Sequence, residues 1–413
     1  MPTVLVIGYV WPEPNSSAAG KRMLQLLEYF KLTQYKVIFA TTATPSNNVA
    51  NLEELDIESV KIELNNPSFD IYIQHLQPEI VLFDRFMMEE QFGWRVTKNS
   101  SSSIKILDTE DLHFLRGFRE KNNSESILNS ELAKREVASI YRCDVSLIIS
   151  ENEMKLLLET FNIPEDLLIF LPFLLTPINE EQIALLPSFE ERQHFVSIGN
   201  FKHKPNVDAV KFLKSDIWPL IRKDLSNAEM NIYGAYPTAA IGQLNNSKEK
   251  FHVRGWAKNA EEVVTNSRVS LAALRFGAGL KGKLVEAMQC GTPTITTNIG
   301  AEGIAGNLPW NGFIEDNPKA FAEAAIQLYN TKSIWQKSQS NGFNIINSRY
   351  NKNTFYNTLK NKLSFLKANL KAHRSNNFTG AMLMHHRVKS TQHLSKYIEA
   401  KNKLETFKNS SKN

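Results

Sequence analysis

Short apolar runs, each followed by a segment with helical spacing, recur along most of this 413-residue chain. The apolar runs of the first half lie at residues 4–8, 37–40, 79–83, 104–107 and 145–149. Those of the second half lie at residues 195–199, 230–233, 252–254, 269–273 and 294–297. Such runs are typical of strands buried on both faces, and strands that alternate with helices form parallel sheets. The pattern therefore predicts an α/β fold with two Rossmann-like, doubly wound domains.

The alternation stops once, in a stretch with weak periodicity that contains Pro, Glu and Gln, and we interpret residues 179–193 as a linker. The linker separates a first domain at residues 1–178 from a second at 194–345, and both lengths are ordinary for single domains. Residues 346–413 are predicted to form C-terminal helices and a basic tail.

The charge of the chain is mildly basic and unevenly distributed. The formal net charge is +5, and from Lys360 onward twelve Lys and Arg residues stand against two acidic residues, Glu399 and Glu405. This excess suits an anionic ligand such as a nucleotide, or an anionic membrane surface. Because the basic residues gather in the tail rather than along an aromatic-lined face, the sequence disfavours a nucleic-acid-binding module.

Cysteine usage and hydropathy bear on the compartment. The two cysteines, Cys143 and Cys290, lack metal-ligand spacing and form no disulfide framework, which fits a reducing cytoplasm. The first residues do not resemble a signal peptide, and no apolar run approaches the ~20 residues needed to span a bilayer. We therefore expect a cytoplasmic protein whose membrane contact, if it has one, is peripheral.

A glycine-rich loop between a predicted strand and a predicted helix carries the strongest chemical signal. Its glycines allow backbone N–H groups to approach an anion, and the helix that follows adds free N–H groups and a positive dipole end. Its basic residues add charge that neutralises a diphosphate. The residues expected to bind a diphosphate here are Arg275, Gly277, Ala278, Gly279, Lys281 and Lys283. The alternative is a plain glycine-rich turn with solvated lysines, and the loop matches neither the Walker A nor the dinucleotide pattern.

Four segments occur in an order that identifies a family. They are residues 195–209 (FVSIGNFKHKPNVDA), 277–288 (GAGLKGKLVEAM), 290–293 (CGTP) and 300–303 (GAEG). Together they resemble the donor domain of the family 4 retaining glycosyltransferases of the GT-B fold, also called glycosyl transferases group 1. The resemblance covers about residues 3–365.

The resemblance implies a nucleoside-diphosphate sugar bound by the second domain, facing an interdomain cleft. Backbone amides of the glycine-rich loop would hold the diphosphate, and Glu286 matches the ribose-binding carboxylate. Lys204 matches a basic residue that neutralises the leaving phosphate. The base would lie near Arg254 and Trp256, and a carbohydrate or lipid-linked acceptor would lie on the first domain.

Two positions depart from the family pattern. Many members have a sugar-contacting glutamate at the position of Ala278, and many have arginine at the position of Asn200, which we still place beside the diphosphate. Because Glu302 lies in the next βα loop, we take it as a candidate replacement for the missing glutamate. The alternative is that Glu302 only favours a helix N-terminus.

Polar loops of the first domain supply acceptor-side candidates. Gly20 and Arg22 follow the first strand and are candidates for the cleft lining, although they also fit a capped helix start. Asp111 and His113 follow the strand at residues 104–107, where a carboxylate and an imidazole can orient or deprotonate an acceptor hydroxyl. A structural role is the alternative for both. We find no metal-ligand spacing and no Asp-x-Asp signature, so we expect neither metal nor cofactor beyond the nucleotide sugar as co-substrate.

The tail is predicted to be helical, with a break at residues 376–380, a last basic helix at 390–408 and disorder at 409–413. Three interpretations stay open for it. It binds anionic lipid peripherally, it crosses back onto the first domain, or it is a solvated basic helix.

The sequence thus predicts a glycosyltransferase of hexosyltransferase type that moves a sugar to an acceptor hydroxyl. We expect retention of configuration, independence from metal, and a role in cell-surface polysaccharide or lipopolysaccharide synthesis at the inner face of the membrane. A sugar-nucleotide epimerase of the same fold and a catalytically inactive nucleotide-sugar-binding protein are the alternatives.

Overall fold

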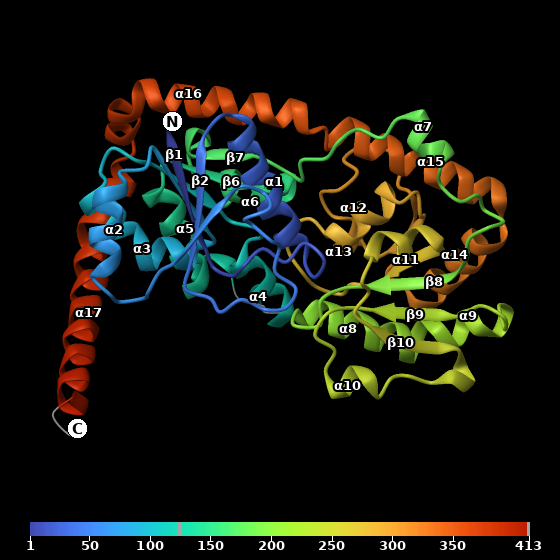
Figure 1. The fold of residues 1–413 in the computed structure, drawn as a ribbon. Helices are drawn as coiled ribbons and strands as arrows, with labels where there is room; N and C mark the ends of the chain where they lie inside the picture. Colours follow the sequence, from blue (N-terminus) through green and yellow to red (C-terminus); the bar gives the residue numbers. More distant parts are fainter. Residues whose placement is uncertain (122–125, 411–413) are drawn as a thin grey trace.

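The computed structural model describes residues 1–121 and 126–410, and its two parallel sheets lie in separate halves of the chain (Figure 1). The first sheet has seven strands in the order β3-β2-β1-β4-β5-β6-β7. Its strands are β1 (Thr3–Gly8), β2 (Lys36–Thr41), β3 (Glu58–Lys61), β4 (Ile80–Asp84), β5 (Ile104–Asp108), β6 (Val145–Ile148) and β7 (Leu168–Phe170). This arrangement confirms the predicted α/β class.

Helices cover both faces of the first sheet because its strands are apolar on both faces. Along β1, Val4 and Val6 belong to one buried cluster, whereas Leu5 and Ile7 belong to the other. The helices are α1 (Ala18–Leu32), α2 (Ser68–Leu76), α3 (Phe86–Asn99), α4 (His113–Lys121), α5 (Glu131–Arg142) and α6 (Glu151–Glu159). Two 3-10 turns, η1 (Ile127–Asn129) and η2 (Glu165–Leu167), complete this half.

The second sheet has six parallel strands in the order β10-β9-β8-β11-β12-β13. They are β8 (Gln193–Ile198), β9 (Met230–Tyr233), β10 (Phe251–Gly255), β11 (Ser267–Ala272), β12 (Thr294–Thr296) and β13 (Gly312–Ile314). The helices are α7 (Glu180–Ala184), α8 (Lys204–Phe212), α9 (Trp218–Asp224), α10 (Ala239–Gly242), α11 (Ala260–Asn266), α12 (Gly282–Gln289), α13 (Asn298–Ala301), α14 (Pro318–Asn330) and α15 (Lys332–Arg349). A π-helical turn (Leu213–Ile217) joins α8 to α9, and a 3-10 turn (Ser247–Glu249) precedes β10.

The chain passes between the two halves twice, and the two passages are hydrogen-bonded to each other. The Leu175 N–H donates to the Tyr350 carbonyl at 2.8 Å, and the Lys352 N–H donates to the Leu175 carbonyl at 2.8 Å. An apolar cluster that includes Phe173 from the first half and Leu284 from the second fills the space beside them. The halves therefore share a packed interface as well as two covalent connections.

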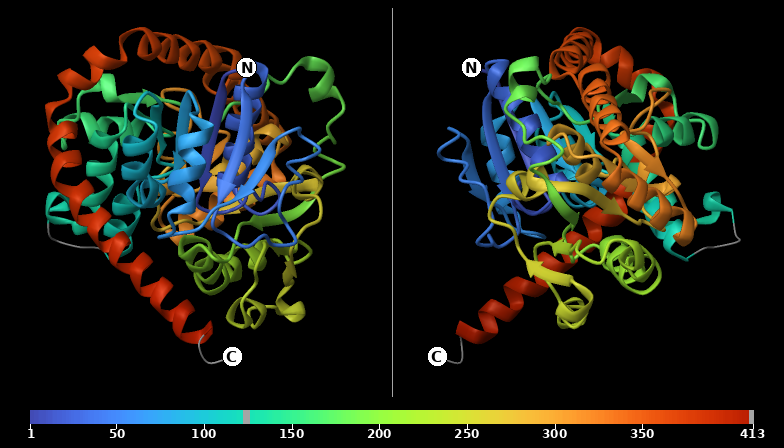
Figure 2. Two further views of the ribbon diagram at one scale, coloured as in Figure 1. Left: turned by 60° about the vertical axis from the view of Figure 1, so that its left-hand side comes forward. Right: turned by 90° about the vertical axis from the view of Figure 1, so that its right-hand side faces the viewer.

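The C-terminal segment returns to the first domain, as one interpretation of the tail predicted. α16 (Lys352–Asn376) runs along the top of the molecule and α17 (Phe378–Ser410) descends past α2 and α3 (Figures 1 and 2). Leu359, Leu363 and Leu366 of α16 belong to the core of the first sheet. The break between the two helices lies inside the predicted range. α17 continues through Asn409 and Ser410, where we predicted disorder, and residues 411–413 lie outside the described residues.

Three short strands escaped prediction, each for a visible reason. β3 has the sequence ESVK and is mostly exposed, so it has no apolar run. β7 and β13 have three residues each, too few to show a period. All three lie at or next to a sheet edge, where burial on both faces is not required.

Candidate active site

The loop between β11 and α12 has a backbone that only glycine adopts without strain. Gly277 and Gly279 have φ angles of 152° and 63°. The Lys281 ammonium donates to the Gly279 carbonyl at 2.8 Å and is itself buried. α12 begins at Gly282, so the free N–H groups of its first turn point toward the loop. The loop therefore has the features of an anion-binding turn at a helix N-terminus.

Side chains of the first domain engage this loop directly. Glu153, in the first turn of α6, is 1% exposed. Its Oε1 accepts the Gly279 N–H at 2.8 Å and the Leu112 N–H at 3.0 Å. Arg119 of α4 donates to the Gly277 carbonyl at 2.9 Å. An amide that we expect to bind diphosphate is thus already bonded to a carboxyl group of the other domain.

The environment of Glu153 favours its neutral form. Burial, and next the negative charge of Asp111, raises the pKa of Glu153 to about 8, although the two N–H donors and Lys281 oppose the rise. Burial also lowers the pKa of Lys281, against the pull of Glu302 and Glu153. Ionised forms of both groups are therefore disfavoured while the domains stay in contact.

Glu286, the expected ribose ligand, lies on α12 and is paired across the domain interface. The Lys21 ammonium of α1 lies 2.6 Å from the Glu286 Oε1, and the carboxylate side chain is 16% exposed. A ribose diol donates hydrogen bonds as an ammonium does, so Lys21 occupies the position that the sugar hydroxyls would take. Nothing in the sequence alone indicated this partner for Glu286.

Glu302, the candidate sugar-contacting carboxylate, forms a two-pronged ion pair with Arg119. Both nitrogen–oxygen distances are 2.7 Å, and the Lys281 ammonium lies 4.0 Å from the same carboxylate. Burial alone would raise the pKa of Glu302, but Arg119 and Lys281 outweigh it and hold the pKa below its usual value. Ala278, where a glutamate was expected, packs against the apolar core of the first domain.

The four remaining diphosphate candidates point in different directions. Arg275 donates to Asp208 of α8 at 2.8 Å and stacks on a phenyl ring, so its guanidinium is held by α8. Lys204 lies 2.6 Å from Glu120 of α4. Lys283 donates to the Asn206 side chain at 2.7 Å, and burial lowers its pKa to about 8. Asn200 is buried, and its side chain accepts the Lys202 N–H at 2.8 Å.

The two residues proposed to bind the nucleotide base have different surroundings. Trp256 is 44% exposed and donates its indole N–H to the Asn15 carbonyl at 3.2 Å, across the domain interface. Arg254 instead donates to Asn231 at 2.8 Å and to Glu229, at the amino end of β9. Arg254 lies next to the carboxyl end of β10, where ligands of parallel sheets bind, and its role in base binding stays a prediction.

The two candidates of the acceptor-side loop, Gly20 and Arg22, both contact their own domain. Gly20 follows the N-cap Ser17, and a Cβ at Gly20 would lie 2.5 Å from the Glu13 carbonyl, so glycine permits this close approach. Arg22 is 1% exposed and donates to Asp108 and to two carbonyls of the chain beyond β7. The prediction that Arg22 lines the cleft is wrong, because its guanidinium is fully engaged inside the first domain.

Asp111 and His113 lie at the carboxyl end of β5, close to the glycine-rich loop. The Asp111 carboxylate is bonded to Arg116 at 2.7 Å. Burial would raise the pKa of Asp111, but Arg116 and then His113 lower it below its usual value. The His113 Nδ1 lies 3.1 Å from the Asp111 carbonyl and 3.5 Å from Glu136. Asp111 is therefore held ionised beside the glycine-rich loop between β11 and α12, which we call the donor loop. His113 contacts residues of its own domain.

Three more carboxyl groups, those of Asp84, Asp108 and Glu110, gather at the ends of β4 and β5. Asp84 and Asp108 are almost fully buried, and each has one oxygen without a hydrogen-bond partner in the described structure. Burial raises the pKa of Asp84 and raises that of Glu110 well above its usual value. The carboxyl-edge rule that pointed to Asp111 applies equally to these three groups.

Sequence reasoning missed Lys21, Glu153 and Arg119, the residues with which the first domain engages the donor loop. Glu153 follows the end of β6 and was detectable by the same edge rule. Arg119 lies on α4, a helix that we did not predict. No local pattern signals contacts between segments more than a hundred residues apart.

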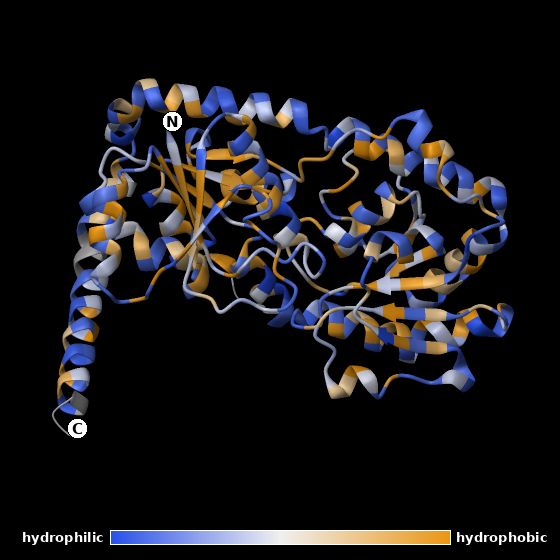
Figure 3. Ribbon diagram, in the orientation of Figure 1, coloured by the Kyte–Doolittle hydropathy of each residue, from blue (hydrophilic) through white to orange (hydrophobic). Residues whose placement is uncertain are grey.

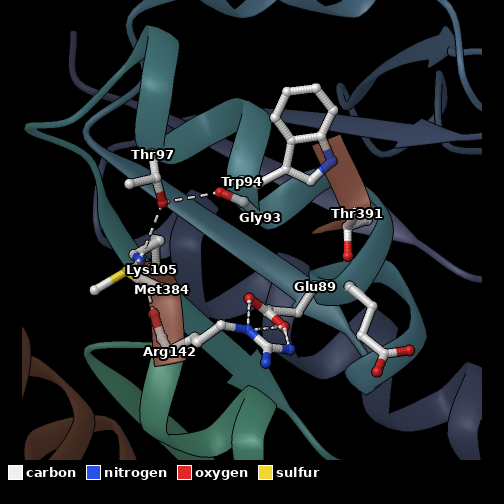
Figure 4. Close-up of a pocket in the computed structure, with 9 residues that line it drawn as sticks. Glu89, Gly93, Trp94, Thr97, Lys105, Arg142, Met384 and Thr391 are labelled. Carbon is white, nitrogen blue, oxygen red and sulfur yellow. Dashed lines mark hydrogen bonds and ion pairs between the residues drawn. The ribbon is translucent and has the colours of Figure 1, made fainter. Parts of the chain in front are cut away.

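A cavity of about 30 Å³ lies away from this interface, between α3, α5 and α17 (Figure 4). Glu89, Lys105 and Arg142 line it, together with Met384 of α17. Nucleotide sites occupy several hundred Å³, whereas this space suits one or two waters. Within the described residues, no cluster of His, Cys, Asp and Glu side chains is arranged to hold a metal ion, and no helix is long and apolar enough to cross a bilayer.

Comparisons with known proteins agree with this fold. Residues 192–331 match the family model described as glycosyl transferases group 1. Sucrose-phosphate synthase from Thermosynechococcus elongatus has a TM-score of 0.67 and 13% identity, over 89% of this chain and 100% of that one. WaaG, a glycosyltransferase involved in lipopolysaccharide biosynthesis, has a TM-score of 0.61 and 10% identity, over 86% and 98%.

A third solved structure is the S. aureus TarM G117R mutant in complex with Fondaparinux, alpha-GlcNAc-glycerol and UDP. Its TM-score is 0.56 with 13% identity, and the match covers 71% of this chain but only 58% of that one. A search of curated proteins gave no match. At these identities the solved structures establish the fold alone.

Two parallel-sheet domains facing each other across the glycine-rich loop define the GT-B class of proteins. Within that class, residues 192–331 of the second domain match glycosyl transferases group 1.

Proposed function

We propose that the protein transfers a sugar from a nucleoside-diphosphate sugar to an acceptor hydroxyl, with retention of configuration and without a metal ion. The observation that carries this proposal is the pairing of a glycine-rich anion turn with Glu286 on one helix at the domain interface. The N–H groups of the turn suit a diphosphate, and a carboxylate one turn into the helix suits a ribose diol.

The charge of the leaving diphosphate has protein partners in this arrangement. Lys281 and Lys283 lie beside the helix N-terminus, and a bound anion would favour the charged forms that burial now disfavours. These groups support a metal-independent reaction. Retention rests on the resemblance to family 4. The acceptor hydroxyl would approach from the first domain, where Asp111 is held ionised.

We propose a carbohydrate or lipid-linked acceptor in cell-surface polysaccharide or lipopolysaccharide synthesis, at the cytoplasmic face of the membrane. TarM was solved with UDP and WaaG is involved in lipopolysaccharide biosynthesis, which favours this class of donor and acceptor. No cofactor is required by the proposed reaction. An epimerase would interconvert the sugar without acceptor, and an inactive protein, favoured by Ala278, would bind nucleotide without turnover.

A thermal-shift series with ADP, CDP, GDP, UDP, dTDP and their sugars tests the donor. We expect one nucleoside diphosphate, with its sugars, to raise the melting temperature by roughly 5 °C at about 100 times its Kd. Ligand binding then adds about 2.7 kcal/mol to the free energy of unfolding. Glu286→Gln should lower the affinity for that ligand about tenfold or more, because it removes the charged acceptor of the ribose hydrogen bonds. Glu323→Gln, on an exposed face of α14, is the matched control.

No shift with any of these compounds would refute the donor assignment. Once the ligand is found, its sugar is incubated with glycan acceptors in EDTA, and the anomeric configuration of the product is read by NMR. Loss of transfer in EDTA would refute metal independence, and an inverted product would refute retention.

The distal part of α17 supports the membrane location. Tyr397, Leu404 and Phe407 are 67%, 54% and 70% exposed. With the exposed Ala400 they recur at spacings of three, four and three, which places them on one helix face. Lysines flank this stripe on both sides, namely Lys396, Lys403, Lys401 and Lys408. Figure 3 shows apolar and polar residues mixed along this protruding helix.

An apolar stripe between rows of lysine suits an anionic lipid surface better than a second copy of the helix, whose lysines would repel. We expect the protein to bind phosphatidylglycerol vesicles and not phosphatidylcholine vesicles. The double variant Leu404→Glu and Phe407→Glu should lose about tenfold or more in partitioning, measured by vesicle sedimentation. The control is Leu55→Glu with Leu185→Glu, at two exposed sites elsewhere. Equal losses in both variants would contradict the assignment to α17.

A further inference from the structure

The first domain presents to the donor loop the same chemical groups that a nucleotide would present. Glu153 offers an oxygen to the Gly279 N–H, as a phosphate would. Lys21 offers N–H donors to the Glu286 carboxylate, as ribose hydroxyls would. An acceptor oxygen thus lies at the glycine turn and a hydrogen-bond donor at Glu286, which is the order in which a diphosphate and a ribose would lie.

The Gly279 N–H is not available to a diphosphate while these contacts persist. A single methyl group added at Gly279 would lie 2.8 Å from the Asp111 Cβ, closer than real carbon atoms approach. Glu153 is 1% exposed, and its second oxygen is buried with no hydrogen-bond partner among residues 1–121 and 126–410. Since one N–H group forms one strong hydrogen bond, Glu153 and a phosphate oxygen exclude each other at Gly279.

Resting on the donor assignment above, we propose that Glu153 is a positioning residue that holds the donor loop against the first domain. A diphosphate takes the Gly279 N–H only after Glu153 releases it and the domains separate. The chain therefore binds its donor in competition with its own carboxyl group.

The position of Glu153 makes this competition sensitive to pH. In the contact its pKa is about 8, whereas a solvent-exposed glutamate titrates near 4.3. The contact is therefore strongest below the lower value and weakens as the pH rises through about 8. Asp111, from the loop after β5, and Lys281, from the donor loop, are the charged groups that act on it, in opposite directions.

Isothermal titration with the nucleoside diphosphate found in the thermal-shift series, UDP or another, tests this inference on the full chain. At pH 7 we expect Glu153→Ala to bind it about tenfold more tightly than the unmodified protein. Glu153→Gln keeps the neutral contact but cannot ionise when the domains separate, so it should bind more weakly than the unmodified protein at pH 7. Between pH 7 and 8, affinity should rise for the unmodified protein and then level off, whereas neither variant should show this rise. Glu159→Ala, at an exposed site on α6, is the control.

Unchanged or weaker binding by Glu153→Ala, with the unmodified protein binding normally, would overturn the inference and leave the donor assignment intact. Small-angle scattering without nucleotide gives an independent readout. The radius of gyration should increase for Glu153→Ala and not for Glu153→Gln, and equal values for all three proteins would also overturn the inference. Circular dichroism melting curves verify that each variant is folded.

Discussion

Replacing Gly279 with valine is expected to remove nucleotide binding and to lower sugar transfer at least about 100-fold. The backbone φ of 63° is strained for any branched side chain, and the new Cβ would lie 2.8 Å from Asp111. The loop would therefore lose the conformation that presents its N–H groups to a phosphate. Titration calorimetry and an initial-rate assay measure the two effects.

Gly242→Val is the matched control, because a Cβ at Gly242 meets no atom within 4 Å. We expect this control to keep its nucleotide affinity within about twofold, as exposed substitutions usually do. Normal affinity in the Gly279 variant would show that the diphosphate does not depend on the glycine turn.

Replacing Arg22 with alanine is expected to cost about 3–5 kcal/mol of unfolding free energy. Arg22 donates to the Asp108 Oδ1 at 3.1 and 3.0 Å and to the Leu171 and Pro172 carbonyls at 2.7 and 3.0 Å. Because Asp108 is 0% exposed, the substitution leaves a carboxylate buried without its cation. Urea denaturation followed by intrinsic fluorescence measures the loss.

Lys21→Ala removes a neighbouring cation from the same helix and serves as the control. Lys21 is partly exposed, so its ion pair with Glu286 should contribute no more than about 1 kcal/mol. Equal destabilisation by the two substitutions would contradict the structural role of Arg22.

The sequence predicted well those features that depend on neighbours along the chain. The apolar residues 4–8 predict β1 because a strand covered on both faces must be apolar at every position. Val4 to Ile7 are indeed 0% exposed. The turn at Gly277 is detectable for a similar reason, since its backbone requires glycine. β3 lacks such a local requirement because it lies at the sheet edge, and its polar residues concealed it.

Partnerships across the domain interface could not be predicted in this way. Arg22 and Lys21 are adjacent basic residues on one helix, yet one is buried in its own domain and the other reaches Glu286, 265 positions away. Which of them faces the interface depends on the rotation of α1 against the sheet.

The paired passages at Leu175 and Tyr350 determine how the two domains can move. A domain attached through one flexible segment can rotate about three axes. Two attachments that lie side by side leave one easy rotation, about the line that joins them. The hydrogen bonds between the passages keep them side by side. Separation of the domains is then a bending about these passages, and a twist that would bring the donor loop opposite a different part of the first domain is suppressed. In the proposed reaction, the return of α16 to the first domain would preserve the alignment of donor and acceptor each time the domains part and meet.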